Sequence, residues 1–431
     1  MTYRRSRRGT AEDRGKILHW PDKDEGPDRG ILSTVARLVP GVVTGAANVD
    51  PSLVVTATVV GATFRYSLLW VVVLCVPLLE TIFGVSARLG YETRKGLVDL
   101  LRENYGRSMA LFCAGLIVLI NMAMIVADLM AVSDALSILL GQRRIYFVTA
   151  VAFSIWYILI FRNYRKITNA LLWLSLPLFV YVLAAFLAAP TLAQVIRGTF
   201  VPKVYAISSY AAAAVGMFGS LLTPYVLVWQ TSSRREQAVT GGERPHGLES
   251  RAGTLVTTVL SFCVIVAAGS VLHFSSPVEM TTRQAALALQ PAVGAWGPII
   301  YSLGIIGAGM VALPVLVASL CYSVSESLRW RSGLSENPWD AKGFYALISL
   351  AMLVAALGNF IHINPVKALY WSQILAGLLT VPILVFVLLL SNDRRIMRTT
   401  NTRYQNFWIG ASIGLLVAIT GLWAFWSLVP K

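Results

Sequence analysis

Two short stretches in which proline interrupts an apolar segment carry the residues best suited to chemistry. Residues 47–52 read Ala-Asn-Val-Asp-Pro-Ser, and residues 219–225 read Gly-Ser-Leu-Leu-Thr-Pro-Tyr. Pro51 and Pro224 lack a backbone donor and clash with the preceding turn, so each breaks a helix and frees backbone carbonyl groups. Asp50 adds a carboxylate, a hard oxygen ligand, at the first break. An acid at membrane depth is a functional candidate by default, and this pattern predicts a cation site.

Further polar residues are predicted to surround this acid. Ser52 follows the first proline, Thr223 and Tyr225 flank the second, and Gln373 lies in a later apolar segment. Their hydroxyl and amide groups suit hydrogen bonds to the waters of a partly hydrated ion; ordinary polar contacts between helices are the alternative. Asp50 has an alternative role as well, because an aspartate at a kink commonly caps a helix.

Three more acids fall within apolar segments: Glu80, Asp128 and Asp134. They could form a proton route, an entry path for cations, or a set of buried partners of one another, and the sequence leaves these three interpretations open. A proton relay needs a chain of titratable groups. The interiors of the apolar segments contain no histidine, which weighs against proton coupling.

The elements that must position these residues are membrane-spanning helices. The chain of 431 residues is 56% hydrophobic and 13% charged, with a mean hydropathy of +0.67. A soluble protein of this length could not bury so much apolar surface. Apolar runs of about 20 residues predict transmembrane helices. We expect eleven spans, at residues 35–62, 67–88, 109–140, 145–161, 169–190, 206–231, 252–274, 296–328, 343–361, 365–390 and 406–429.

The charge distribution predicts an orientation. Of the 36 Lys and Arg residues, 28 fall in the N-terminal tail and in alternate loops between the predicted spans. Cytoplasmic loops carry such an excess, so we expect a multi-pass protein of the cell membrane with its N-terminus in the cytoplasm and its C-terminus outside. The net charge of +15 then reflects loops beside the lipid bilayer and not a nucleic-acid partner. The sequence does not identify any protein partner, so protein partners stay unknown.

The positions of the two breaks predict an internal repeat. They fall in spans 1 and 6, and broken helices at corresponding positions of two halves are typical of inverted-repeat transporters. We expect a basic cytosolic tail at 1–34, a first repeat of five helices at 35–190, a second at 206–390, and an additional helix 11 at 406–431. The sequence has no nucleophile–base pair or phosphate-binding loop, so we expect neither an enzyme nor a cofactor.

Several segments resemble the Nramp family of divalent-metal transporters. Asp-Pro-Ser-Leu at 50–53 lies where the family has Asp-Pro-Gly-Asn, and Thr-Pro-Tyr at 223–225 lies where it has Met-Pro-His. Tyr-Ser-Leu-Leu-Trp at 66–70, Ser-Ala-Arg-Leu-Gly at 86–90, Asp-Leu at 128–129 and Ser-Gln at 372–373 also match family segments. The resemblance implies an all-α LeuT-type fold and metal transport. It also implies that the backbone carbonyls of Ala47 and Ser220 join Asp50 and residue 223 as ligands.

The departures from the family pattern fall on functional positions. Leu53 replaces an asparagine ligand, Thr223 replaces a methionine ligand, and Tyr225 and Gln230 replace histidines. Asn121 and Ala131 stand at positions that are usually acidic. This pattern is similar to the Nramp-related magnesium transporters, a branch thought to move Mg²⁺ without protons.

The resemblance therefore predicts Mg²⁺ uptake with tolerance of Mn²⁺, by alternating access and without proton coupling. The membrane potential alone supplies about 2.3 kcal/mol per charge per 100 mV, so uptake of a divalent ion needs no coupling ion. Four alternatives remain: a proton-coupled Mn²⁺ or Fe²⁺ symporter, a carrier of a trivalent ion such as Al³⁺, an organic-solute carrier on the same fold, and a receptor that does not transport.

Overall fold

The computed structural model describes residues 48–161, 176–239, 247–274, 280–334, 336–360 and 363–428. Helices make up nearly all of the ordered elements in these ranges, because long apolar segments can satisfy their backbone groups only internally. The first half contains α2 (Pro51–Phe64), α3 (Leu69–Thr93), α4 (Leu97–Tyr105), α5 (Arg107–Leu140), α6 (Arg144–Phe161), the 3₁₀ turn η1 (Leu176–Phe179), α8 (Val180–Leu187) and α9 (Leu192–Phe200).

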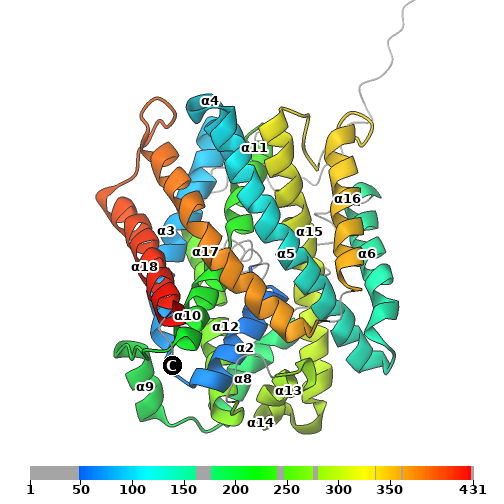
Figure 1. The fold of residues 1–431 in the computed structure, drawn as a ribbon, viewed down its shortest axis with the longest axis vertical. Helices are drawn as coiled ribbons and strands as arrows, with labels where there is room; N and C mark the ends of the chain where they lie inside the picture. Colours follow the sequence, from blue (N-terminus) through cyan, green and yellow to red (C-terminus); the bar gives the residue numbers. More distant parts are fainter. Residues whose placement is uncertain are drawn as a thin grey trace, which may run out of the picture.

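The second half begins with the other broken helix. It contains α10 (Ser208–Leu221), α11 (Pro224–Val239), α12 (Gly247–Val271), α13 (Thr282–Ala286), η2 (Leu287–Leu289), α14 (Gln290–Val293), η3 (Gly294–Trp296), α15 (Gly297–Leu328), α16 (Lys342–Gly358) and α17 (Pro365–Asn392). The last helix, α18 (Arg403–Leu428), packs along α10, α17 and α3 at the edge of the bundle (Figure 1).

Packing between the halves follows the expected repeat. α5 packs most extensively on α15, and α3 contacts α12, α2 contacts α10, and α6 contacts α16 (Figure 1). These are helices 3 and 8, 2 and 7, 1 and 6, and 4 and 9 of the predicted order. A two-fold relation between two halves brings elements near its axis against their own counterparts. The contacts therefore agree with a five-plus-five arrangement, while the predicted domain boundaries stay a prediction.

Each predicted span corresponds to a helix in the described part of the chain, but the lengths differ. Among the described residues, eight helical stretches are long and apolar enough to cross a membrane, and one of them, Ser208–Ser232, contains the second break. α2 and α16 are shorter apolar helices, and the η1–α8 segment is bent by 115° against α9. The first parts of predicted spans 1 and 5 lie outside the described residues, as does the tail. α4, α9, α13 and α14 were not predicted, because helices of nine residues or fewer leave no long apolar run.

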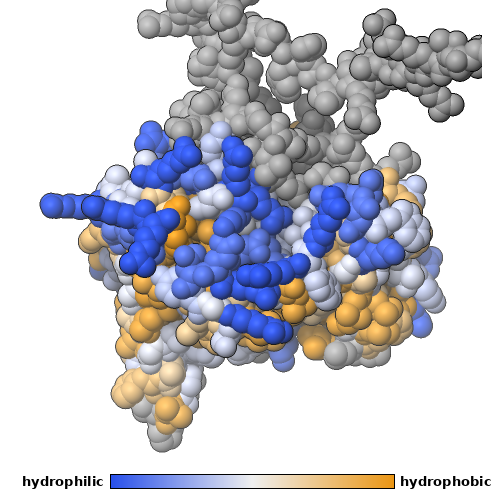
Figure 2. All heavy atoms as spheres, turned by 90° about the horizontal axis from the view of Figure 1, so that it is seen from above, coloured by the Kyte–Doolittle hydropathy of each residue, from blue (hydrophilic) through white to orange (hydrophobic). Residues whose placement is uncertain are grey.

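One end of the bundle collects the loops that the sequence predicts to be cytoplasmic. α4, the α15–α16 connection and the α17–α18 connection all lie at the upper end in Figure 1, and α18 runs from there to the opposite end. Seen from above, this end carries many hydrophilic side chains (Figure 2). The alternation of the described loops thus agrees with the predicted spans, and we call this the basic end.

Candidate functional site

Asp50 lies at the first helix break and is fully buried. Its Oδ1 accepts a hydrogen bond from the backbone N–H of Leu53 at 2.6 Å, so Asp50 caps α2, with Pro51 in the first helical position. Asp50 therefore does act as a helix cap, but the cap uses only one of its two carboxylate oxygens. The hydroxyl of Tyr225, at the start of α11, donates to Asp50 Oδ2 at 3.2 Å. Asp50 thus joins the two breaks.

The second break frees the carbonyl predicted to bind an ion. α10 ends at Leu221 and α11 starts at Pro224. In a continuous helix the Ser220 carbonyl would accept from the N–H of residue 224, but proline has none. Pro51 stands at the same spacing after Ala47 in the sequence. Ala47 itself lies outside the described residues, so its predicted carbonyl contact stays a prediction.

A buried amide connects the second break to the first and to α12. Thr223 Oγ1 donates to Asn48 Oδ1 at 3.3 Å, and Asn48 Nδ2 donates to Thr257 Oγ1 at 3.5 Å. Asn48 is 2% exposed, and Thr223 and Thr257 are fully buried. Asn48 is not among the site residues predicted from the sequence. Its position two residues before the buried acid was the available signal.

Asp128 is brought to the first break by Ser52. The Ser52 hydroxyl donates to Asp128 Oδ1 at 2.5 Å, and both side chains are fully buried. Asp128 Oδ2 is buried and has no hydrogen-bond partner within the described ranges. One predicted acid of span 3 therefore lies against the start of α2 with an oxygen left over.

Gln373 lies beside the end of α10. A Cβ added to Gly219 would clash with the Gln373 backbone carbonyl and with Gly377, so α10 and α17 approach closely here. The Gln373 side chain is fully buried, and neither amide atom has a hydrogen-bond partner among the described residues. Buried polar atoms in native proteins are nearly always paired with protein or water, so this amide is suited to bind water or an ion.

The other two predicted acids are not part of this cluster. Glu80 forms an ion pair with Arg251 at 2.6 Å, and the two side chains are 34% and 65% exposed. Asp134 is half-buried further along α5. No hydrogen bond or ion pair in the described ranges joins Glu80, Asp128 and Asp134 to one another, so the suggestion that they are mutual buried partners is wrong.

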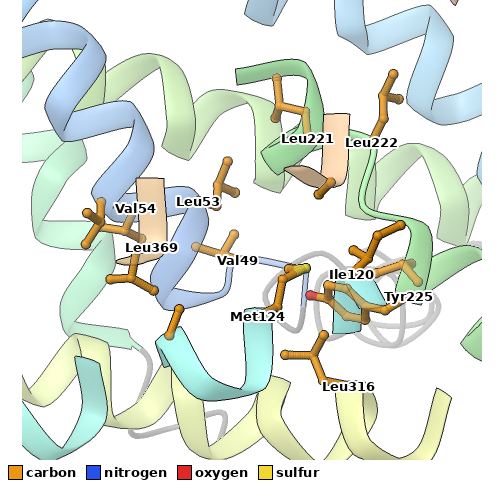
Figure 3. Close-up of a cluster of buried hydrophobic side chains, with 14 of the residues drawn as sticks. Val49, Leu53, Val54, Ile120, Met124, Leu221, Leu222, Tyr225, Leu316 and Leu369 are labelled. Carbon is orange, nitrogen blue, oxygen red and sulfur yellow. The ribbon is translucent and has the colours of Figure 1, made fainter. Parts of the chain in front are cut away.

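Leu53 and Asn121, two of the positions where the sequence departs from the family pattern, have packing roles. Leu53 is buried, contributes its backbone N–H to Asp50, and lies among the apolar side chains around the breaks (Figure 3). The Tyr225 hydroxyl points toward Met124 in the same view. Asn121 donates to the Leu316 carbonyl at 3.3 Å and to Ser319 Oγ at 2.5 Å, which ties α5 to α15.

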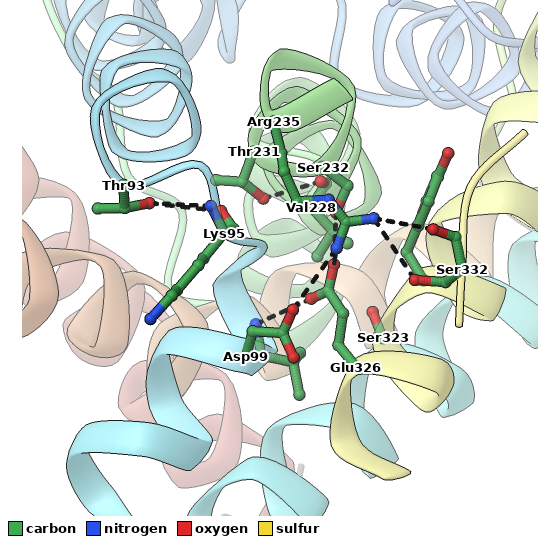
Figure 4. A network of polar contacts seen from close by, with 12 residues as sticks. Thr93, Lys95, Asp99, Val228, Thr231, Ser232, Arg235, Ser323, Glu326 and Ser332 are labelled. Atoms are coloured by element: carbon green, nitrogen blue, oxygen red, sulfur yellow. Dashed lines mark hydrogen bonds and ion pairs between the residues drawn. The ribbon is translucent and has the colours of Figure 1, made fainter. Parts of the chain in front are cut away.

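A second polar cluster at the basic end was missed by the sequence analysis (Figure 4). Glu326, in the last turn of α15, is buried, with 1% of its surface exposed. Its carboxylate accepts from the Val98 N–H at 3.2 Å, from Ser232 Oγ at 2.9 Å and from Arg235 at 3.4 Å. An acid in an apolar span was the available signal, but its partners come from α4 and α11.

Arg235 holds this cluster together. Its guanidinium also faces Asp99 at 3.5 Å and donates to the carbonyl of Ser332 at 3.3 Å. Burial raises the pKa of the Asp99 carboxyl, and the nearby Arg235 charge opposes that rise. The cluster fastens α11, the second half of the broken helix, to α4 and α15.

The chemistry available at the breaks is oxygen chemistry. Among the described residues, no group of three or more His, Cys, Asp or Glu side chains is placed to hold a metal. The four cysteines are free and buried, as expected for small apolar residues. An ion at the breaks would therefore meet one carboxylate together with carbonyl, hydroxyl and amide oxygens, the ligands that hard cations prefer.

Comparison with known proteins finds one matching family and several relatives. A family model described as natural resistance-associated macrophage protein-like matches residues 41–427. The metal transporter NRAT1 of Oryza sativa subsp. japonica is 24% identical over 303 residues, which cover 64% of this chain and 54% of that protein. The chain thus spans about half of the rice relative. The divalent metal cation transporter MntH of Klebsiella pneumoniae is 25% identical over 405 residues, 90% of this chain and 93% of its own length.

Solved structures show the same fold. The manganese transporter of Eremococcus coleocola has a TM-score of 0.70 at 17% identity, covering 94% of this chain and 91% of its own. Mhp1, a nucleobase-cation-symport-1 family transporter, has a TM-score of 0.53 at 12% identity, covering 90% of this chain and 92% of its own. The predicted LeuT-type all-α architecture is confirmed.

Proposed function

Since the chain belongs to the natural resistance-associated macrophage protein-like (Nramp) family, we propose that it carries divalent metal cations across a membrane by alternating access. Its relatives are metal transporters, and the chain is not an enzyme. We take Mg²⁺ as the main substrate, with Mn²⁺ tolerated. The observation that carries the proposal is the meeting of both helix breaks at Asp50, the only carboxylate that contacts both of them in the described structure.

The ligand set supports a hard and partly hydrated ion. Thr223 offers a hydroxyl and Leu53 offers no ligand, so neither position supplies a sulfur and few side chains are direct ligands. Mg²⁺ gives up water reluctantly and is commonly held by one or two carboxylates while it keeps several waters. The amide of Gln373 and the Oδ2 of Asp128, which have no hydrogen-bond partner among the described residues, are buried polar groups suited to bind such waters.

Transport without protons is part of the proposal. Asn121 is engaged in packing α5 against α15, and Ala131 is buried and apolar, so neither titrates. If the protein lies in the cell membrane with its basic end facing the cytoplasm, an inside-negative potential of 100 mV contributes about 4.6 kcal/mol to the entry of a divalent ion. The substrate's own charge is then a sufficient driving force.

Uptake into proteoliposomes tests both the substrate and the coupling. We expect an inside-negative potential to drive saturable Mg²⁺ uptake that Mn²⁺ inhibits, with no change in the signal of an internal pH dye. An inwardly directed Mg²⁺ gradient should drive uptake at both pH 6 and pH 7.5. Acidification of the lumen that depends on the metal and is absent from empty vesicles would contradict uncoupled transport.

A proton-coupled Mn²⁺ or Fe²⁺ symporter is the second candidate. The observation that favours it is Asp128, which is buried beside Ser52 at the first break and has one oxygen without a partner in the described ranges, because a single acid there could carry one proton. In the liposome assay this candidate predicts metal-dependent acidification that is lost in Asp128→Asn. An organic-solute carrier fits less well, because a buried acid at the break repels a substrate carboxylate.

Ligand softness at two positions should set selectivity. Leu53→Asn with Thr223→Met adds an amide oxygen and a thioether sulfur next to Asp50, so we expect binding of Cd²⁺ and Mn²⁺ to strengthen relative to Mg²⁺. Calorimetric titration of the double variant and the parent measures the change. Tighter Mg²⁺ binding with unchanged Cd²⁺ binding would contradict the softness argument.

A further inference from the structure

The buried amide of Asn48 has no role in the proposed site so far, yet it lies between the two breaks. It contacts Thr223, directly before Pro224, and belongs to the stretch that ends at Asp50. Thr223 lies two residues before Tyr225, whose hydroxyl donates to Asp50. Oxygen-bearing groups of the two breaks are therefore paired twice, Asn48 with Thr223 and Asp50 with Tyr225.

The direction of the hydrogen bonds fixes which end of the amide faces the break. Thr257 Oγ1 donates its proton to the Gly253 carbonyl at 3.1 Å, so its oxygen is left to accept from Asn48. Asn48 must therefore turn its N–H₂ toward α12 and its Oδ1 toward Thr223. Because the Thr223 proton points at this oxygen, the remaining lone pairs of both oxygens are left for a cation.

The spacing of the oxygens suits the coordination shell of a hard cation. Neighbouring oxygens of an octahedral shell lie about 3.0 Å apart at Mg²⁺ distances and about 3.4 Å apart at Ca²⁺ distances. Asn48 Oδ1 and Thr223 Oγ1 are 3.3 Å apart, and Tyr225 Oη and Asp50 Oδ2 are 3.2 Å apart. Both pairs thus have the separation of neighbouring ligands.

We propose that Asn48 is an ion-binding residue of this transporter, whose amide oxygen forms with Thr223 a pair of neutral oxygen ligands opposite Asp50. This assignment rests on the proposed function. It supplies a neutral hard oxygen at a site where Leu53 provides none, and the hydrogen bond to Thr257 holds that oxygen in place. Asn48 then favours Mg²⁺ over softer ions, for which an amide oxygen is a poorer ligand.

Calorimetric titration of the detergent-purified full chain with Mg²⁺ tests the assignment. We expect Asn48→Ala to weaken Mg²⁺ binding at least tenfold, and Asn48→Asp to retain or strengthen it, because aspartate keeps the oxygen and adds charge. Asn359→Ala is the matched control: it removes a buried amide that, among the described residues, donates to the carbonyls of Val126 and Ala355, and it should leave the affinity unchanged.

A residue needed only to hold the helices would behave differently. Aspartate cannot donate to Thr257, so both Asn48 variants would then lose affinity to the same extent and unfold at lower temperature. That result, or wild-type affinity in Asn48→Ala, overturns the assignment of Asn48 but not the proposed function. Absence of saturable Mg²⁺ and Mn²⁺ binding by the unmodified chain overturns the proposed function and this inference together.

Discussion

Asp50→Asn should leave the protein folded and reduce saturable ion uptake to the level of empty liposomes. Asparagine caps helices as well as aspartate does, so the hydrogen bond to the Leu53 N–H survives. What disappears is the negative charge that faces Tyr225 and would balance a divalent ion. The loss of a charged ligand from a site with few direct ligands should reduce binding by orders of magnitude.

Comparison with Asp50→Ala separates the two roles of this carboxylate. Alanine removes the charge and the cap, so it should abolish uptake in the same way and also lower stability by about 1 kcal/mol. Potential-driven Mg²⁺ uptake and thermal unfolding in detergent measure the two effects. Wild-type uptake by Asp50→Asn would refute the location of the site, while loss of folding in both variants would assign Asp50 to structure alone.

Arg235→Met should cause the largest loss of stability among single replacements of a charged residue in the described structure. It leaves the Glu326 carboxylate buried without its counter-charge, and breaking a buried pair in this way costs about 3–5 kcal/mol. Glu326→Gln should cost much less, because the amide can keep the hydrogen bond of Ser232 while Arg235 still faces Asp99. The order of the two effects is the informative result.

Thermal unfolding of the single and double variants measures the coupling. We expect Arg235→Met with Glu326→Gln to be more stable than Arg235→Met alone, since the buried charge is gone. Arg251→Met is the matched control, because its ion pair with Glu80 is exposed and should contribute little. Equal unfolding temperatures of Arg235→Met and Arg251→Met would mean that Glu326 does not depend on Arg235.

The contacts that hold α11 against α15 also affect transport. α11 starts at the break, next to Thr223 and Tyr225, and ends at the basic end, where Arg235 and Ser232 bind Glu326. Movement of this half-helix relative to α15 therefore has to break buried polar contacts. The same cluster that stabilises the described conformation also raises the free energy of opening the basic end.

The membrane spans and the two breaks follow from local features of the sequence. Long apolar runs are sufficient to predict the spans, because a lipid environment allows almost no other structure. Pro51 and Pro224 are sufficient to predict where two helices stop, because the missing N–H is a covalent property of the residue. These local facts, with the spacing of five spans between the breaks, predict an all-α membrane protein with an inverted repeat, and the resemblance to the Nramp family implied the LeuT-type fold.

Which polar residues contact one another depends on how the helices pack. Glu80 and Asp128 are both acids within apolar spans, yet one pairs with an exposed arginine and the other is buried against Ser52. Helices that are apolar on all sides carry no periodic signal of which face turns inward, so the sequence could not separate these cases. Asn48 with Thr223, and Glu326 with Arg235, are pairs that are remote in the chain. Their contacts depend on how the two halves pack, which no local pattern encodes.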